Sequence, residues 1–171
     1  MTDPFEALGL PRKFALAPGE LDARVRELQR VLHPDRHTQA SPSERRAALS
    51  RAVTVNEAYR TLRDDLSRAE ALLRARGVPT EAGPSGEPAF LLEVMELREA
   101  LADAKARHDR EALTRLGDGV RRDAQKARDE IAAALDERDR PAEAAAPLAR
   151  LRYYRRFLDE HEVALEALAA G

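Results

Sequence analysis

Apolar side chains recur three and four positions apart along most of the chain, which is the spacing of an α-helix. One such stripe, in residues 19–32, comprises Leu21, Val25, Leu28, Val31 and Leu32. The stripe of the segment that begins at Ser41 comprises Leu49, Ala52, Val55, Tyr59 and Leu62. The alternation typical of strands is missing from the sequence. The pattern therefore predicts an all-α protein.

Capping and helix-breaking residues predict where the first four helices begin and end. A short helix begins at Pro4 and ends near Gly9. The second helix ends at His33, because Pro34 disfavours helical geometry in the residue before it and donates no amide hydrogen. The sequence Ser41-Pro42-Ser43-Glu44 forms a capping box with proline at the first helical position, so the third helix begins there. A fourth helix is expected from about Asp65 to Arg76.

The segment Val78–Pro88 separates two halves of the chain. It holds three prolines and two glycines and follows Gly77. Because these residues interrupt helices, the segment is predicted to be a linker. We therefore expect an N-terminal domain at residues 1–77, a linker at 78–88 and a C-terminal domain at 89–171.

The C-terminal domain is expected to contain three long amphipathic helices. They span about residues 90–116, 120–138 and 144–169. Gly117-Asp118-Gly119 is predicted to turn the chain between the first two, and Asp139-Arg140-Pro141 is predicted to end the second. Short turns between amphipathic helices are typical of an antiparallel three-helix bundle.

Composition and charge narrow the classes of function. The chain is 43% hydrophobic and 35% charged, as in a folded protein, and its net charge of −2 disfavours nucleic-acid binding. Residues 1–77 hold 14 Lys and Arg against 11 Asp and Glu, which favours an acidic partner. The sequence contains no run of eighteen apolar residues and no basic, apolar leader. We therefore expect a cytoplasmic protein without membrane contact.

The tripeptide His33-Pro34-Asp35 stands between the second predicted helix and the capped third helix. Arg24, Arg26 and Arg30 lie mostly off the apolar stripe of the second helix, and Arg36 follows the tripeptide. J domains carry this tripeptide in the same position between two helices. Asp3-Pro4-Phe5 and Leu8-Gly9-Leu10 also match the first helix of that family, so residues 1–77 resemble the J-domain family. The resemblance implies a J domain, built from a helical hairpin and short helices, that stimulates an ATPase chaperone of the HscA/DnaK class.

The same resemblance implies a role for each of these residues. His33, Pro34 and Asp35 are expected to contact the ATP-bound chaperone, and Arg24, Arg26, Arg30 and Arg36 to meet its acidic surface. The residue types suit this role, since Asp35 can accept a charge-assisted hydrogen bond from an arginine and Pro34 fixes the loop. None of them is required to transfer a proton, so we expect an ATPase activator and not an enzyme.

Two alternatives remain for this loop. Pro34 and Asp35 can simply break a helix and cap a turn. Alternatively, His33, Asp35 and His37 could supply three ligands to zinc or iron in a small metal-dependent enzyme. No distant cluster completes such a site, because His108 and His161 are predicted to be isolated surface residues, and the chain has no cysteine. We therefore expect neither metal nor cofactor.

The C-terminal domain opens with Ala89–Glu99, a stretch that resembles the HscB family of co-chaperones in iron–sulfur cluster assembly. Further matches to that family are Asn56-Glu57-Ala58-Tyr59, Thr61-Leu62-Arg63, Arg68–Leu73 and Leu151-Arg152-Tyr153. The resemblance covers essentially the whole chain. It implies that the C-terminal domain binds the iron–sulfur cluster scaffold protein and presents it to the chaperone.

The resemblance also implies which residues bind the scaffold protein. Leu91, Leu92 and Met95 match an apolar patch, Glu96, Glu99 and Asp103 match its acidic edge, and Tyr153 matches an aromatic neighbour. Helical spacing places most of these residues on one face. Periodicity alone fits bundle core for the apolar ones as well as it fits a binding surface. A J-domain protein with a different client also remains open.

Overall fold

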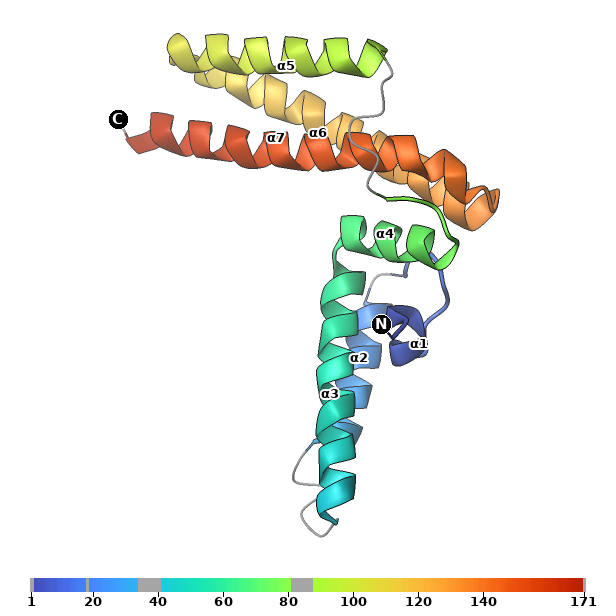
Figure 1. Cartoon of the computed structure of the whole chain (residues 1–171). Coiled ribbons are helices and arrows are strands. Elements are labelled where there is room, and N and C mark those ends of the chain that lie inside the picture. The colour runs from blue at the N-terminus through green and yellow to red at the C-terminus, as the bar shows by residue number, and fades with distance from the viewer. Residues whose placement is uncertain (1, 18, 34–40, 81–87, 171) are drawn as a thin grey trace. The chain divides into compact units, whose positions relative to one another are not determined.

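The computed structural model describes residues 2–17, 19–33, 41–80 and 88–170, and every regular element within them is helical (Figure 1). The elements are α1 (Pro4–Leu8), α2 (Glu20–Leu32), α3 (Pro42–Arg63), α4 (Asp65–Ala75), α5 (Pro88–Ala106), α6 (Arg110–Ala132), a π-helical turn η2 (Ala133–Glu137), a 3-10 helix η3 (Pro141–Ala144) and α7 (Ala145–Ala170). The all-α prediction is thus confirmed. The chain divides into two compact units, Met1–Val78 and Pro79–Gly171, which we describe separately.

The helices of the first unit begin at polar caps, as the sequence predicts. Asp3 accepts a hydrogen bond from the Phe5 amide at the start of α1. At the start of α3, the Glu44 amide donates to Ser41 Oγ, and the Ser41 amide donates to Glu44 Oε2 over 2.7 Å, which completes the capping box. These side chains satisfy amides that the first helical turn leaves without partners.

The helices α2 and α3 form an antiparallel hairpin. The Gln29 side chain donates to Asn56 Oδ1 over 3.2 Å, and the Tyr59 hydroxyl donates to Asp22 Oδ1 over 2.9 Å, so residue numbers rise along one helix and fall along the other. Helices α1 and α4 and the α1–α2 loop cover one part of the hairpin. The buried core that results includes Phe5, Leu8, Phe14, Val25, Val55, Leu62, Leu72 and Leu73.

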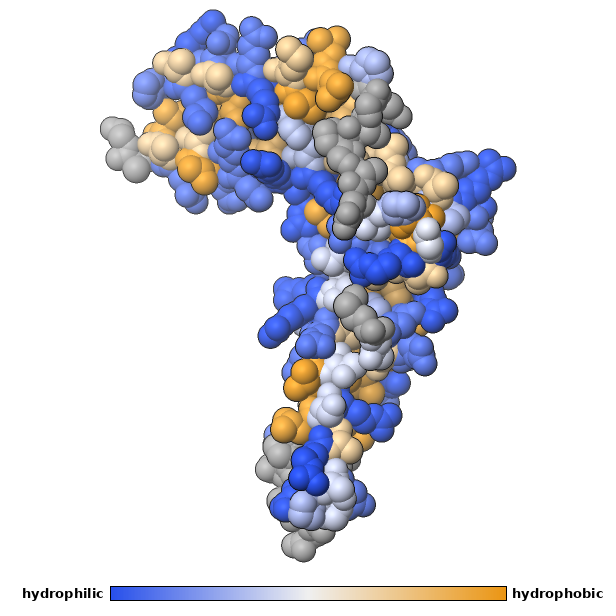
Figure 2. Space-filling model, viewed as in Figure 1, coloured by the Kyte–Doolittle hydropathy of each residue, from blue (hydrophilic) through white to orange (hydrophobic). Residues whose placement is uncertain are grey.

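Two members of the predicted apolar stripes do not enter this core. Val31 is 53% exposed and Leu49 is 68% exposed, so the prediction that they face inward is wrong. The hairpin extends beyond α1 (Figure 1), so α1 does not cover the first turns of α3, where Leu49 lies. Figure 2 shows hydrophobic surface on this part of the hairpin.

The second unit is a bundle of α5, α6 and α7. Its core includes Phe90, Leu101, Leu113, Val120, Ile131, Leu135, Leu148, Leu151, Tyr154 and Phe157. The chain turns between α5 and α6 at residues 107–109, not at Gly117-Asp118-Gly119, so the predicted turn is wrong. Asp109 caps α6 by accepting from the Ala112 amide over 2.8 Å, and His108 closes the turn with a φ of 53° without a glycine.

Gly117 lies buried inside α6 because a histidine of α7 fills the space beside it. A Cβ on Gly117 would lie 2.5 Å from Cε1 of His161. The His161 Nε2 lies 2.7 Å from the Leu113 carbonyl oxygen, so this nitrogen carries the hydrogen and donates it. His161 is only 1% exposed, and the prediction that it is a surface residue is therefore wrong.

Candidate functional site

His33 ends α2 in the first unit. Its backbone is extended, with a φ of −60° and a ψ of 132°, the geometry that a following proline favours. The other residues of the predicted chaperone-binding loop, Pro34, Asp35 and Arg36, lie outside the described residues. His37, which belongs to the alternative metal site, lies outside them as well.

The structure places the three arginines of α2 on two different flanks. Arg24 faces α1, where its Nε donates to the Leu8 carbonyl over 2.7 Å and its Nη1 pairs with Glu27. Arg26 lies on the other flank, beside the Tyr59 ring of α3, and Arg30 is exposed one turn further along. Arg24 therefore helps to attach α1 to the hairpin, whereas Arg26 and Arg30 point to solvent.

Two exposed apolar residues on α3 were missed as candidates for a binding surface. Leu49 is 68% exposed and Val53 is 50% exposed. With Asn56 they follow one another at steps of four and three, so they share one face of α3. Because Asn56 bonds to Gln29, this face adjoins the flank of α2 that carries Arg26. The spacing of Leu49, Val53 and Asn56 places a polar residue on the same helical face as the two apolar ones. The polar Asn56 is the signal that could have identified this face as exposed.

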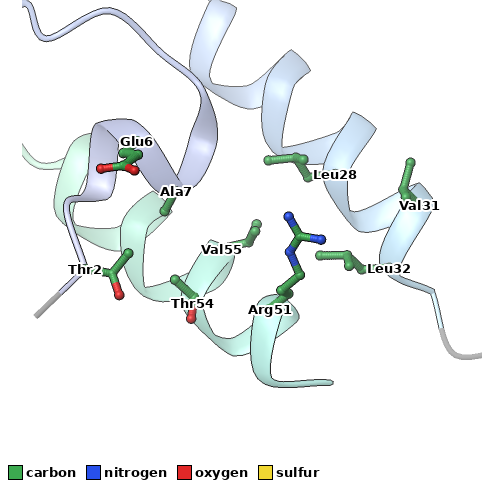
Figure 3. A pocket seen from close by; sticks show the side chains of 9 residues that line it. All are labelled: Thr2, Glu6, Ala7, Leu28, Val31, Leu32, Arg51, Thr54 and Val55. Atoms are coloured by element: carbon green, nitrogen blue, oxygen red, sulfur yellow. The ribbon is translucent and has the colours of Figure 1, made fainter. Parts of the chain in front are cut away.

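A groove lies on the opposite flank of the hairpin, between α1, α2 and α3 (Figure 3). It has a volume of about 470 Å³, and its walls include Leu28, Leu32 and Val55. Arg51 extends across it toward Leu28 and Leu32 (Figure 3). Its nine lining residues include one carboxylate, that of Glu6, and no histidine, cysteine or lysine.

The described part of the chain contains neither a cluster of metal-binding side chains nor a membrane-spanning helix. No group of three or more His, Cys, Asp or Glu side chains in that part could hold a metal ion. None of the helices described there combines the length and the apolar character needed to cross a bilayer.

The second candidate surface is the outer face of α5, which we call the α5 ridge and which consists of Leu91, Leu92, Met95, Glu96, Glu99 and Asp103. Its apolar members Leu91, Leu92 and Met95 are 45%, 57% and 67% exposed. All three carboxylates are exposed too. Figure 2 shows the hydrophobic part of this surface over the first turns of α5. Exposed apolar groups edged by charges are typical of a protein-binding site.

The opposite face of α5 forms the bundle core. Phe90 and Leu101 are each 3% exposed and Ala104 is 5% exposed. Helical spacing places these residues on the side of α5 away from Met95 and Glu99. The structure therefore answers the question that periodicity left open: Leu91, Leu92 and Met95 lie at the surface and not in the core.

Tyr153 of α7 lies beside the first turns of α5. Its hydroxyl donates to the Val94 carbonyl of α5 over 3.3 Å, and its ring is perpendicular to that of Phe90 with the centroids 5.8 Å apart. Burial raises the pKa of the Tyr153 hydroxyl, and a hydrogen bond from Arg98 partly opposes that shift. The hydroxyl therefore stays protonated at neutral pH and can donate.

The neighbouring Tyr154 contacts the buried side of α5 through Glu93. Glu93 was not identified as a candidate from the sequence. The Tyr154 hydroxyl donates to Glu93 Oε1 over 2.6 Å, and Tyr154 is 4% exposed. Burial and this carboxylate raise the pKa of Tyr154. No basic residue stands three or four positions from Glu93 in the sequence. The sequence pattern therefore predicts no partner for Glu93, and only the packing of α5 on α7 reveals its bond with Tyr154.

Comparison with known proteins connects both units to one family. Residues 86–162 match the family model described as the HSCB C-terminal oligomerisation domain. A "Co-chaperone protein HscB homolog" from Aromatoleum aromaticum is 37% identical over 97% of this chain and 95% of its own length. The protein of the same description from Burkholderia multivorans is 39% identical over 96% of this chain and 94% of its own length. Another, from Ralstonia nicotianae, is 49% identical, with a match that spans 66% of this chain and 65% of that relative.

Solved structures give the same result for the fold. The chaperone HscB from Vibrio cholerae has a TM-score of 0.80 and 32% identity, covering 98% of this chain and 99% of that one. The human co-chaperone protein HscB has a TM-score of 0.81 and 28% identity, covering 95% of this chain and 82% of that one. In both cases the similarity extends across the two units.

Proposed function

This chain belongs to the HscB family of co-chaperones, and on that premise we propose that it couples an iron–sulfur cluster scaffold protein to the ATPase cycle of an HscA/DnaK-class chaperone. In this proposal residues 1–77 are a J domain, residues 78–88 a linker and residues 89–171 the scaffold-binding domain. The J domain stimulates ATP hydrolysis by the partner, and the second domain delivers the client.

The observation that carries the proposal is the exposure of Leu91, Leu92 and Met95 on the side of α5 away from the bundle core. Exposure of these three apolar side chains to water is unfavourable. Binding of a partner surface that covers them is stabilised by roughly 25 cal/mol for each Å² of apolar area buried. Methionine adapts to irregular partner surfaces. The carboxylates of Glu96, Glu99 and Asp103 would meet basic groups of the scaffold protein and orient it.

On the first domain, the outer flank of α2 supplies the chaperone contact. Arg26 and Arg30 offer cations to an acidic surface, and His33 begins the loop that contains Pro34 and Asp35. We assign Leu49 and Val53 of α3 to the same contact, because their exposed face adjoins this flank. Binding would favour the hydrolysis-competent conformer of the chaperone, so the reacting groups belong to the partner.

The direct test measures the steady-state ATPase of a purified HscA or DnaK chaperone with this protein, with and without the scaffold protein. We expect this protein to raise the rate and the scaffold protein to raise it further. A rate that the scaffold protein leaves unchanged would favour a J-domain protein with another client. A rate that never exceeds that of the chaperone alone would refute the proposal.

We predict that Leu92→Ala combined with Met95→Ala weakens scaffold binding on the order of 10-fold or more, as expected when central apolar contacts are truncated. The melting temperature should change little, because both side chains are more than half exposed. Isothermal titration calorimetry and thermal unfolding monitored by circular dichroism measure the two effects. Val163→Ala is the matched control, since Val163 is 65% exposed on α7 and lies outside the ridge.

For the surface on α3, we predict that Leu49→Ser combined with Val53→Ser lowers chaperone affinity roughly 5-fold, because each serine removes apolar contact area from the interface. The free protein should stay folded, since both residues lie at the surface. The concentration of this protein that gives half-maximal ATPase stimulation measures the change. An unchanged half-maximal concentration would exclude α3 from the chaperone contact.

A further inference from the structure

Two consecutive tyrosines of α7, Tyr153 and Tyr154, each donate a hydrogen bond to α5. The Tyr153 hydroxyl donates to the Val94 carbonyl over 3.3 Å, and the Tyr154 hydroxyl donates to Glu93 Oε1 over 2.6 Å. Neighbouring residues of a helix point about 100° apart, so the two hydroxyls reach α5 from different directions. The Phe90 ring stands perpendicular to both tyrosine rings, with centroids 5.8 and 6.1 Å away.

Polar groups on each side hold these hydroxyls in place. On the first side, the Tyr153 hydroxyl donates to the Val94 carbonyl, and Arg98 is close enough to oppose the rise in the pKa of that hydroxyl. On the second side, Glu93 and Tyr154 border a small cavity of about 230 Å³ whose other walls are Ala127 and charged side chains of α6 and α7. Those side chains include the Arg150–Glu130 ion pair.

These hydrogen bonds matter because burial alone does not determine how α5 is rotated about its own axis. Burial of Phe90 and Leu101 sets the inner face, but Val94 and Leu97 beside them are only partly buried and Leu91 is 45% exposed. A small rotation toward Leu91 would exchange apolar side chains at the edge of the core and change the buried apolar area little, without burying the carboxylates of the ridge. Hydrogen bonds lose their strength steeply when their angles change, so they select one rotation.

We propose that Tyr153, Tyr154 and Glu93 are positioning residues for scaffold binding, because they fix the rotation of α5 at which the α5 ridge faces outward. The inference rests on the proposed function of the ridge. A ridge that is held in its binding orientation before the partner arrives loses less free energy on binding, and the observed affinity falls in proportion to the fraction of molecules in that orientation.

The test compares scaffold affinity among variants of the full chain by isothermal titration calorimetry. Tyr153→Phe combined with Tyr154→Phe removes both hydroxyls and keeps both rings, and we expect about 10-fold weaker binding. Glu93→Gln keeps an oxygen acceptor for Tyr154 and should bind within about twofold of wild type, whereas Glu93→Ala should weaken binding several-fold. Hydrogen exchange of the α5 amides should be faster in the double phenylalanine variant.

Two controls make the result decisive. Ile131→Val removes one buried methylene from α6 and lowers the melting temperature while leaving Tyr153, Tyr154 and Glu93 intact. Affinity loss in Ile131→Val equal to that of the tyrosine variant, or wild-type affinity in the tyrosine variant, would overturn the positioning role. Leu92→Ala with Met95→Ala tests the ridge itself. Wild-type binding by that variant would overturn the proposed function, whereas weak binding by it, together with wild-type binding by the tyrosine variant, would overturn only the positioning role.

Discussion

Asp35→Asn is expected to reduce ATPase stimulation of the partner chaperone to its basal rate while the chain stays folded. Asparagine has nearly the shape of aspartate but no charge, so it cannot replace the charge-assisted hydrogen bond that we assign to an arginine of the partner. Loss of one member of such a pair costs about 2–5 kcal/mol in an interface. A loss of about 2 kcal/mol alone weakens binding roughly 30-fold, because about 1.4 kcal/mol corresponds to a tenfold change in affinity.

The matched control is Glu57→Gln, which removes one negative charge from the same domain. Glu57 is exposed on α3 and follows the tripeptide by more than 20 positions in the sequence. We expect it to stimulate the ATPase like the wild type. Both variants should retain the helical circular dichroism of the wild type. An Asp35→Asn variant that stimulates normally would show that the J-domain interpretation of the His33-Pro34-Asp35 loop is wrong.

Local signals in the sequence were sufficient for the helix ends of the first unit. The Ser41 capping box and the prolines at positions 4 and 34 act through the backbone of their immediate neighbours, so no knowledge of distant contacts is needed. Burial was predicted less well, since it depends on which other element covers a given turn. Leu49 has the spacing of a core residue, yet the hairpin extends beyond the helix that would cover it.

For the candidate site, the sequence pattern identified the residues of α5 but not their environment. Six of the eight residues from Phe90 to Leu97 are apolar, so periodicity could not separate the two faces of the helix. The separation comes from Phe90, Tyr153 and Tyr154, which lie about 60 positions apart and meet only in the folded bundle. Family resemblance supplied the correct preference for a surface before the packing was known.

Glycine in a helix was the least predictable feature. Gly117 and Gly119 are separated by one acidic residue, which is typical of a turn, but both lie in α6. In the sequence, a glycine that permits a turn looks the same as one that permits close packing. Only the position of His161, more than 40 residues later, distinguishes them.

Gly117→Ala is therefore expected to destabilise the second unit by about 2 kcal/mol. Overpacking of a close contact costs roughly 1–3 kcal/mol, and displacement of the His161 ring from the Leu113 carbonyl costs about 1 kcal/mol more. The higher helix propensity of alanine returns about 1 kcal/mol. The melting temperature of this unit should fall by roughly 10 °C, measured by thermal unfolding and by hydrogen exchange of amides in α6 and α7.

Gly119→Ala is the matched control and should have the opposite sign. A Cβ there would approach only Arg122 Nη2, at 3.9 Å, which is an ordinary contact. Its stability should therefore rise by up to about 1 kcal/mol from helix propensity alone. Equal destabilisation by both alanines would show that α6 needs its glycines for a reason other than His161.

A second substitution at His161 separates the clash from every other effect of Gly117→Ala. His161→Ala removes the ring and should be destabilising by itself, because it leaves a cavity and deletes the bond to Leu113. In that background the added methyl group has space, so Gly117→Ala should cost nothing or stabilise. The coupling free energy of the double-mutant cycle should be about 2–3 kcal/mol. A coupling near zero would mean that the packing of His161 against Gly117 is not what excludes a side chain at position 117.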